Sequence, residues 1–284
     1  MRWNQDKFQL LRIGKNVNIK EETFYFSPNM NSIIEEKEVV KDLGVLVDNK
    51  LTYKAHRQKA IGKVVKLTGW IRRTFFNRSI PFLKTLWNSL LQPHLDYCSV
   101  LTAPSSKSEM MAAEKPLKYF TKLSHEGKNL HYWERLHLFR LLSNQRRMER
   151  YKILYVWKSL NGFVPSIGLT WKQRDPSKLT YPRTYGSVGN VRTLQKCSLS
   201  WEGVKLFNCL PFKIRTFRGS KESFKNVLDQ FLAKIPDQPH GPGLYPEPIN
   251  RLSCNNSNAI VDWIRHLNIG ERRPPIREDD SVIF

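Results

Sequence analysis

Apolar residues recur at three- and four-residue steps between Thr52 and Phe75, which is the period of one face of an α-helix. This apolar face consists of Ile61, Val64, Val65, Thr68, Ile71 and Phe75. A second face of the same segment, called the cationic face below, consists of Lys59, Lys63, Lys66, Trp70 and Arg73. Because a helix must bury its apolar side against another element, the pattern predicts a helical layer with a positively charged outer surface.

Acidic residues are absent from Asn49 to Leu95, and this is the main charge feature of the chain. The basic residues of this span are Lys50, Lys54, Arg57, Lys59, Lys63, Lys66, Arg72, Arg73, Arg78 and Lys84. The whole chain has 47 Lys and Arg against 25 Asp and Glu, a formal net charge of +22. Such a field recruits polyanions, with nucleic acid expected before an anionic membrane surface. The alternative is a solvated basic face without a specific partner.

The cysteines and histidines of this chain lack the spacing of a metal site or of a catalytic group. The four cysteines, at positions 98, 197, 209 and 254, lack the close spacing of a zinc site. We interpret them as reduced thiols of an intracellular protein. His56 and His94 have no partner at ligand spacing, so we predict no catalytic residue and no metal ligand. No run approaches the roughly 18 apolar residues of a membrane helix, and the start resembles no signal peptide, so no membrane partner is expected.

Residues 8–47 favour short strands ahead of the basic helix. The segment 8–14 is apolar and ends at Gly14, and residues 22–36 place a Pro-Asn turn between two apolar runs, which is typical of a hairpin. A third strand is predicted over residues 39–48, with Gly44 inside it. A glycine within a strand indicates a bulge or the close approach of another backbone.

Further helices are predicted over residues 79–92, 106–124, 131–162 (a helical pair), 198–215 and 220–235, with a loop over 163–196. The first of them is capped by Ser79 and interrupted at Pro93, and Pro116 weakens the second. The expected buried stripe of the first is Leu83, Leu86, Trp87 and Leu90. Residues 236–284 are a Pro-rich linker and flexible tail by composition, apart from a helical run at 258–267. The predicted fold class is α+β and mostly α, with a small antiparallel strand region at the N-terminus followed by helices.

Several longer motifs follow one another between residues 1 and 239. They are "MRWNQDKFQLLRIGK", "VVKDLGVLVDNKLTYKAH", "LWNSLLQPHLDYCS", "YWERLHLFRLLSNQRRMERYKILYVWKSLNG" and "FNCLP…SFKNVLDQFL". In this order they resemble a non-LTR retrotransposon (LINE, jockey-like) reverse transcriptase past its catalytic core. The resemblance covers the strand after the active site, the primer-grip strand with the entry to the thumb, the thumb helices and the C-terminal signatures.

The resemblance implies four parts along the chain. They are a palm remnant with primer-grip-like strands over 1–49, a basic helical thumb over 50–128, a helical C-terminal domain over 129–235, and the linker and tail over 236–284. It also implies an RNA-directed DNA polymerase of the nucleus that copies element RNA onto chromosomal DNA.

Polymerases of this family hold two Mg²⁺ on carboxylates that include an aromatic-x-Asp-Asp turn. The Asp-Asp pair of this chain, Asp279-Asp280, stands near prolines without a preceding hairpin, and we interpret it as part of a solvated acidic tail. The expectation is therefore a fragment without the catalytic carboxylates and without a cofactor, since Mg²⁺ is expected only in a full-length polymerase. Its expected partners are the missing palm and fingers segment of the same polyprotein, and nucleic acid.

The resemblance places an RNA/DNA hybrid or duplex DNA on this chain. A polymerase holds a duplex without reading its sequence, which calls for Lys and Arg on phosphates. The predicted nucleic-acid-binding residues are Lys41, Gly44, Lys59, Lys63, Lys66, Trp70, Arg72 and Arg73. Trp70 would stack on a sugar or a base, or else is an indole at the edge of the core. Gly44 would let the primer-grip strand approach the primer closely.

Two alternatives stay open beside the polymerase fragment. One is a host protein that has kept this piece as an RNA- or DNA-binding module. The other is a helical protein-interaction scaffold whose charge only aids solubility. Binding through roughly 6–10 phosphates would lower affinity by about 10³–10⁵ between 50 and 200 mM salt, so a shallow salt dependence would favour the scaffold.

Overall fold

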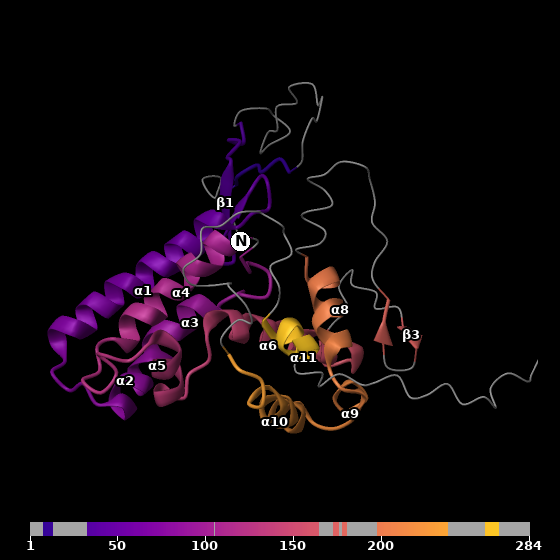
Figure 1. Ribbon diagram of the computed structural model, residues 1–284. Coiled ribbons are helices and arrows are strands. Elements are labelled where there is room, and N and C mark those ends of the chain that lie inside the picture. Colours follow the sequence, from indigo (N-terminus) through magenta and orange to yellow (C-terminus); the bar gives the residue numbers. More distant parts are fainter. Residues whose placement is uncertain are drawn as a thin grey trace, which may run out of the picture.

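The computed structural model describes residues 8–13, 33–104, 106–164, 173–175, 178–180, 198–237 and 259–266. This part of the chain is mostly helical, with a two-stranded antiparallel sheet ahead of the helices, as Figure 1 shows. The predicted fold class is therefore confirmed. Most of the hairpin predicted over 22–36 lies outside the described residues. In the predicted first strand, Leu10 forms an isolated parallel bridge with Glu36.

The N-terminal sheet is a tight hairpin of β1 (Val39–Asp42) and β2 (Val45–Asp48). Leu43 and Gly44 form its two-residue turn, with positive φ angles of 44° and 89°. A turn of this kind needs the left-handed conformation at both positions, which glycine adopts without strain. The prediction of one continuous strand with a bulge at Gly44 is therefore wrong, because the chain reverses there.

The helices that follow enclose the first core. They are α1 (Lys54–Thr74), α2 (Ile80–Leu86), the π-helical turn η2 (Trp87–Leu91), α3 (Gln92–Asp96), α4 (Lys107–Thr121) and α5 (Tyr132–Phe139). α1 packs against α3 and α4, and α5 packs against α2 and α4. The first core consists of Val64, Ile71, Leu83, Trp87, Leu91, Leu117, Phe120, Tyr132, Leu136, Phe139 and Leu141.

The π-helical turn changes which leucines are buried after α2. Leu83 and Trp87 lie in the first core as predicted, but Leu91 continues the buried stripe and Leu90 is exposed. A π-turn holds more residues than an α-turn, so the next buried position comes one residue later than α-helical periodicity predicts. The predicted burial of Leu90 is wrong for this reason.

Pro116 does not end α4, which runs through it. A proline inside a helix removes one backbone hydrogen bond and presses on the preceding turn. In that turn, the carbonyl of Ala113 accepts a hydrogen bond of 2.7 Å from the side-chain amide of Asn144. The turn that the proline disturbs is thus bonded from another helix.

The second core is built on α6 (Asn144–Leu160). Around it lie β3 (Gln173–Asp175), β4 (Lys178–Leu179), α8 (Leu199–Cys209), α9 (Phe212–Arg215), α10 (Lys221–Leu232) and α11 (Ala259–His266). At its centre Trp157 stacks on Phe224 with ring centroids 4.1 Å apart. The second core consists of Ile153, Leu154, Val156, Trp157, Leu179, Val204, Leu206, Phe207, Leu210, Ile214, Phe224, Leu228, Leu232, Ile235, Ile260, Val261 and Ile264.

Two parts of the second core lie within segments whose composition predicts loop, linker or tail. β3 and β4 pair within the segment predicted to be loop, and Leu179 of β4 is buried. α11 is the helical run within residues 236–284, and its Ile260, Val261 and Ile264 are buried in the second core. This helix is therefore packed structure inside a segment whose composition predicts a linker and tail.

The two cores divide between α5 and α6. α5 belongs to the first core through Tyr132, Leu136 and Phe139. α6 contributes to the second core from Ile153 onward. The predicted helical pair of α5 and α6 is therefore divided between two cores, because the apolar face of α5 packs onto α2 and α4.

The N-terminus of α6 joins the two cores. The Glu114 carboxylate of α4 accepts hydrogen bonds from the N–H of Asn144, at 3.0 Å, and from the hydroxyl of Tyr132. The Asp237 carboxylate, after α10, accepts from the N–H and the hydroxyl of Ser143, at 2.6 and 2.7 Å. The free N–H groups and the dipole of a helix N-terminus favour carboxylates, so both halves of the chain are fixed to the same turn.

Arg146, in the first turn of α6, holds the chain that ends α10. Its side chain is buried and donates to the carbonyls of Leu232, Ile235 and Pro236, at 3.2, 3.1 and 2.5 Å. We predict that Arg146→Met lowers the free energy of unfolding by about 3–5 kcal/mol, because these carbonyls lose their donor in a buried site. Urea unfolding followed by circular dichroism measures the loss.

Arg150→Met is the matched control, one turn further along α6. Arg150 pairs with Asp229 at 2.5 Å, but the Asp229 side chain is 46% exposed. We expect this variant to lose less than about 1 kcal/mol. Equal losses in the two variants would contradict the role given to Arg146.

Burial is the main cause that raises the pKa of Glu114 to about 7 from an ordinary 4.5; the Tyr132 hydroxyl opposes the rise and Asp237 adds to it. Between these two pH values the folded protein keeps a proton that the unfolded chain releases. The stabilising contribution is therefore fully present below pH 4.5 and lost as the pH rises to about 7. We predict that the free energy of unfolding falls by roughly 3 kcal/mol over this window relative to Glu114→Gln.

Denaturant unfolding at a series of pH values tests this prediction. The control is Glu126→Gln, since Glu126 is an exposed carboxylate in the turn between α4 and α5. Its stability profile should run parallel to that of the wild type. If the profile of Glu114→Gln is also parallel to the wild type, Glu114 does not take up the proton.

Candidate nucleic-acid interface

The carboxylate of Asp48, the last residue of β2, anchors the start of α1. It accepts hydrogen bonds from the N–H groups of Lys50, Thr52 and Tyr53, at 3.1, 3.0 and 2.6 Å, and from the Thr52 hydroxyl. Burial alone would raise the pKa of Asp48, but these hydrogen bonds outweigh it and leave the pKa below its ordinary value. The hairpin therefore leads into α1 through a fixed turn.

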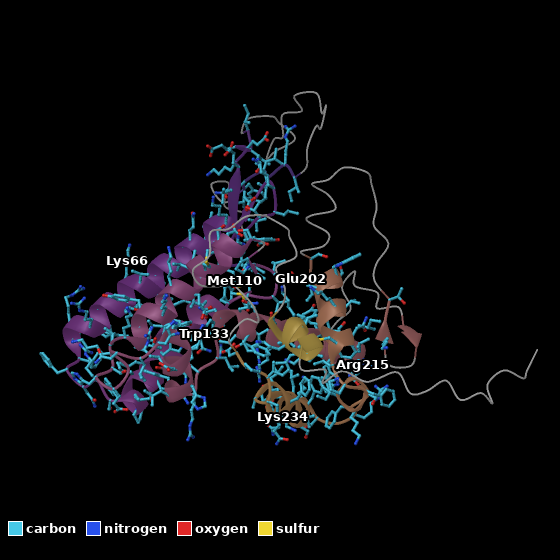
Figure 2. All side chains as sticks on the ribbon, in the orientation of Figure 1. Lys66, Met110, Trp133, Glu202, Arg215 and Lys234 are labelled. Carbon is cyan, nitrogen blue, oxygen red and sulfur yellow. The ribbon has the colours of Figure 1, made fainter. Side chains whose placement is uncertain are left out.

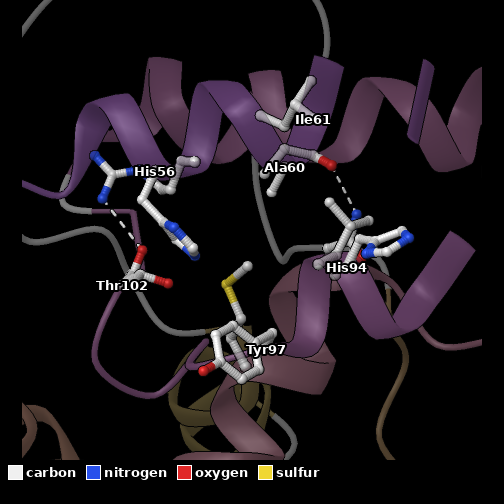
Figure 3. Close-up of a pocket in the computed structure, with 11 residues that line it drawn as sticks. His56, Ala60, Ile61, His94, Tyr97 and Thr102 are labelled. Carbon is white, nitrogen blue, oxygen red and sulfur yellow. Dashed lines mark hydrogen bonds between the residues drawn. The ribbon is translucent and has the colours of Figure 1, made fainter. Parts of the chain in front are cut away.

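The first turn of α1 also packs against α3. Figure 3 shows His56 facing His94 and Tyr97 across a cavity of about 20 Å³, which has room for about one water molecule. Nδ1 of His56 accepts a hydrogen bond of 3.4 Å from the N–H of Leu46. Burial, and then the nearby Lys59, lower the pKa of His56, and burial lowers the pKa of His94. Both imidazoles are therefore neutral near pH 7 and act as packing groups.

Arg57, one of the basic residues of the acid-free span, is not available to a ligand. Its side chain is buried and pairs with Glu109 of α4 at 2.7 Å. It also donates to the carbonyls of Thr52 and Thr102, at 2.7 and 3.1 Å. Its charge fixes α1 to α4 and does not reach the surface.

The cationic face lies on the outer side of α1, where Figure 2 shows Lys66 directed away from α4 and α5. All four cations of this face are exposed, whereas Val64, Thr68 and Ile71 on the opposite side of α1 are buried. At 3.6 residues per turn the cationic face occupies a sector of about 80°. The two-faced character predicted for this helix is confirmed, although Val65 of the apolar face is exposed.

The charge of the cationic face is not neutralised within the described part of the chain. No described carboxylate lies within ion-pair distance of its four cations. Some cations elsewhere are paired, for example Arg147 with Asp96 at 2.6 Å. From Lys59 to Arg73 the face is about 21 Å long at 1.5 Å per residue. This length matches about six base steps of a duplex.

Trp70 adds an aromatic surface to the cationic face. Its side chain is 44% exposed. Its ring lies edge-on to Phe75, with centroids 5.5 Å apart. The indole is therefore held on one side and open on the other, an arrangement that suits stacking.

The remaining predicted residues lie apart from the cationic face. Lys41 is exposed on β1, and Gly44 lies in the hairpin turn, where an added Cβ would be 3.7 Å from the Tyr97 ring. Arg72 is directed toward α4, where it donates to the hydroxyl of Tyr119 at 3.1 Å. The structure therefore gathers the five residues of the cationic face on α1 and leaves these three outside it.

Gly62 and Gly69 lie beside the cationic face, seven residues apart, and hydrophobic periodicity does not single them out. A Cβ at Gly62 would have no atom within 4 Å, and one at Gly69 would meet only the Arg73 guanidinium, at 3.6 Å. Packing therefore requires glycine at neither position. Each glycine inside a helix costs about 0.5–1 kcal/mol relative to alanine, and this repeated cost is the sequence signal that could have found them.

Comparison with known proteins gives one partial match. No family model matches the chain, and no solved structure matches it. An uncharacterized protein of Caenorhabditis elegans is 25% identical over 128 residues. The match covers 44% of this chain and 63% of that protein, so the chain spans less than two thirds of the length of this relative.

The described residues form neither a membrane span nor a metal site. No helix there has the length and apolar character needed to cross a bilayer. The described side chains also include no cluster of three or more His, Cys, Asp or Glu suited to a metal ion. The cationic face can attract a polyanion, and it carries one aromatic ring on which a base can stack.

Proposed function

We propose that this chain binds the phosphate backbone of an RNA/DNA hybrid or of duplex DNA along the cationic face. We further propose that it does so as the thumb and C-terminal part of a non-LTR retrotransposon reverse transcriptase of the nucleus. The observation that carries the proposal is the row of four exposed cations on one side of α1 without a carboxylate partner among the described residues.

The residue types favour phosphate contact over base reading. Three of the four cations are lysines, which act as point charges and bind phosphate without selecting a base. They stand on a helix whose opposite side is buried in the first core, so their spacing along about 21 Å is fixed by a rigid element. A regular polyanion of the same length can contact all of them at once.

Phosphoryl transfer is not part of the proposed role. Polymerases perform it with carboxylates that hold two metal ions, and the proposal gives this chain only the holding of the primer and template. A host protein that retained the same module would bind nucleic acid in the same way. The binding measurement therefore tests the module, whether it belongs to a retrotransposon polymerase or to a host protein. A protein-interaction scaffold would bind nucleic acid weakly or not at all.

We predict that replacing Lys59, Lys63, Lys66 and Arg73 together by Gln reduces the salt dependence of binding. Each phosphate contact contributes about 0.9 to the slope of log affinity against log salt, so the slope should fall by about 3 to 4. Fluorescence anisotropy with an RNA/DNA hybrid at several salt concentrations measures the slope.

The matched control removes four exposed lysines from other surfaces, and these are Lys122, Lys128, Lys213 and Lys234. The net charge of the two variants is the same, but the control should keep most of the slope. If both variants lose it equally, binding follows net charge and the cationic face has no special role. If the wild type shows no steep slope, the nucleic-acid proposal itself fails.

We predict opposite effects on stability and on binding when Gly62 and Gly69 are both replaced by Ala. The helix should become more stable by up to about 1 kcal/mol per site, since alanine loses less backbone entropy and both sites have room. Affinity for the hybrid should fall about tenfold, because two methyl groups would hold the phosphate backbone away from the helix.

Thermal unfolding measures the expected gain in stability, and anisotropy on the same preparation measures the expected loss of affinity. The control is Gln58→Ala, which improves helix propensity at an exposed position of α1 without adding a Cβ. If the double glycine variant gains stability and keeps its affinity, the backbone does not approach the helix at these positions.

A further inference from the structure

The turn between α1 and α2 presents a bare aromatic ring. Phe76 is 92% exposed, the highest value among the large apolar side chains that the structure describes. Phe75 leaves α1 in an extended conformation, with φ −108° and ψ 131°. Successive side chains of an extended segment point to opposite sides, so the packing of Phe75 directs Phe76 outward.

This turn is held in place on both sides of Phe76. Phe75 lies edge-on to both Trp70 and Phe82, with centroids 5.5 Å apart in each pair. Arg78 donates a hydrogen bond of 2.7 Å to the carbonyl of Arg72, at the end of α1. The N–H of Ser79 donates to the Asn77 side chain at 2.9 Å. The exposed ring is therefore carried by a bonded turn.

The surroundings of Phe76 are cationic. Arg72, Arg73 and Arg78 lie within four residues of it, inside the acid-free span from Asn49 to Leu95. Trp70 belongs to the cationic face and contacts Phe75, so the turn begins where the cationic face ends. A single exposed apolar residue is ordinary on a protein surface. An exposed ring on a bonded turn, at the end of a row of cations that no described carboxylate pairs, fits one kind of ligand.

We infer that Phe76 inserts into the base stack at the point where a duplex bound along the cationic face becomes single-stranded. The inference rests on the proposed function and adds to it a stacking site at a defined place. Apolar side chains that enter a base stack must first separate the bases, which costs least where one base already lacks a paired neighbour. The contact of the ring with a base is tolerant of sequence, as phosphate contacts are.

A photocrosslinking experiment on the full chain tests the inference directly. The probe is an RNA/DNA hybrid with a single-stranded template overhang, in which 5-iododeoxyuridine occupies one primer position at a time. Ultraviolet light joins iodouracil preferentially to an aromatic ring stacked on it. We expect a crosslink at Phe76, identified by mass spectrometry, only from the positions next to the junction.

Substitutions at Phe76 provide the second measurement. Phe76→Ala should weaken binding to the junction probe about tenfold or more, the range for loss of one base stack, and should leave the salt slope unchanged. Phe76→Trp should keep the affinity. Phe76→Leu should lose affinity as Phe76→Ala does, because leucine is apolar without a flat ring. Leu101→Ala removes another exposed apolar side chain, 58% exposed against 92% for Phe76, from a different turn and should have no effect.

The outcomes separate this inference from the proposed function. If the wild type binds with a steep salt slope but no primer position crosslinks to Phe76, the inference is wrong and the proposed function stands. If neither the hybrid nor duplex DNA is bound, both fail. If Phe76→Ala weakens binding only to vesicles containing phosphatidylserine, the ring is a membrane contact and the inference is likewise overturned.

Discussion

The N-terminus of α6 is the joint on which the arrangement of the chain depends. Each half of the protein brings a carboxylate to it, Glu114 from α4 and Asp237 from the chain after α10. The N–H groups that donate to them belong to Ser143 and Asn144, and they would have no partner in an isolated helix. A shift of either half by one helical turn would bury carboxylates and N–H groups without partners, which is costly. The joint therefore specifies one arrangement of the two cores.

The way acidic residues are used explains why the surface of α1 is so basic. Several acids serve as internal ties: Glu109 holds Arg57, Asp96 holds Arg147, and Glu114 meets α6. Acids used in this way do not neutralise the cationic face. Like charges at neighbouring positions of a helix destabilise it by a few tenths of a kcal/mol per pair. The packing of α1 into the first core, and the Asp48 turn at its start, offset that repulsion.

Hydrophobic period and charge predicted α1 and its cationic face well, because both are local properties of a long segment. The features that were missed depend on geometry or on distant contacts. The left-handed turn at Leu43 and Gly44 reverses a segment whose composition favours one strand, and the π-turn moves burial from Leu90 to Leu91. The place of α5 in the first core depends on the partners that its apolar face meets. Exposure of the ring at Phe76 could not be predicted either, since neighbouring aromatic residues look alike until one of them is packed.

Pro116 and Asn144 illustrate a dependence that neither residue reveals alone. The proline disturbs a turn of α4, and the amide of Asn144 bonds the Ala113 carbonyl in that turn. Pro116 has no N–H to donate to the Ala112 carbonyl, and the Asn144 amide bonds the neighbouring carbonyl of Ala113. We therefore expect the two positions, far apart in the chain, to be energetically coupled. Among related sequences, a proline in this helix and an amide at the start of the next long one should be gained or lost as a unit.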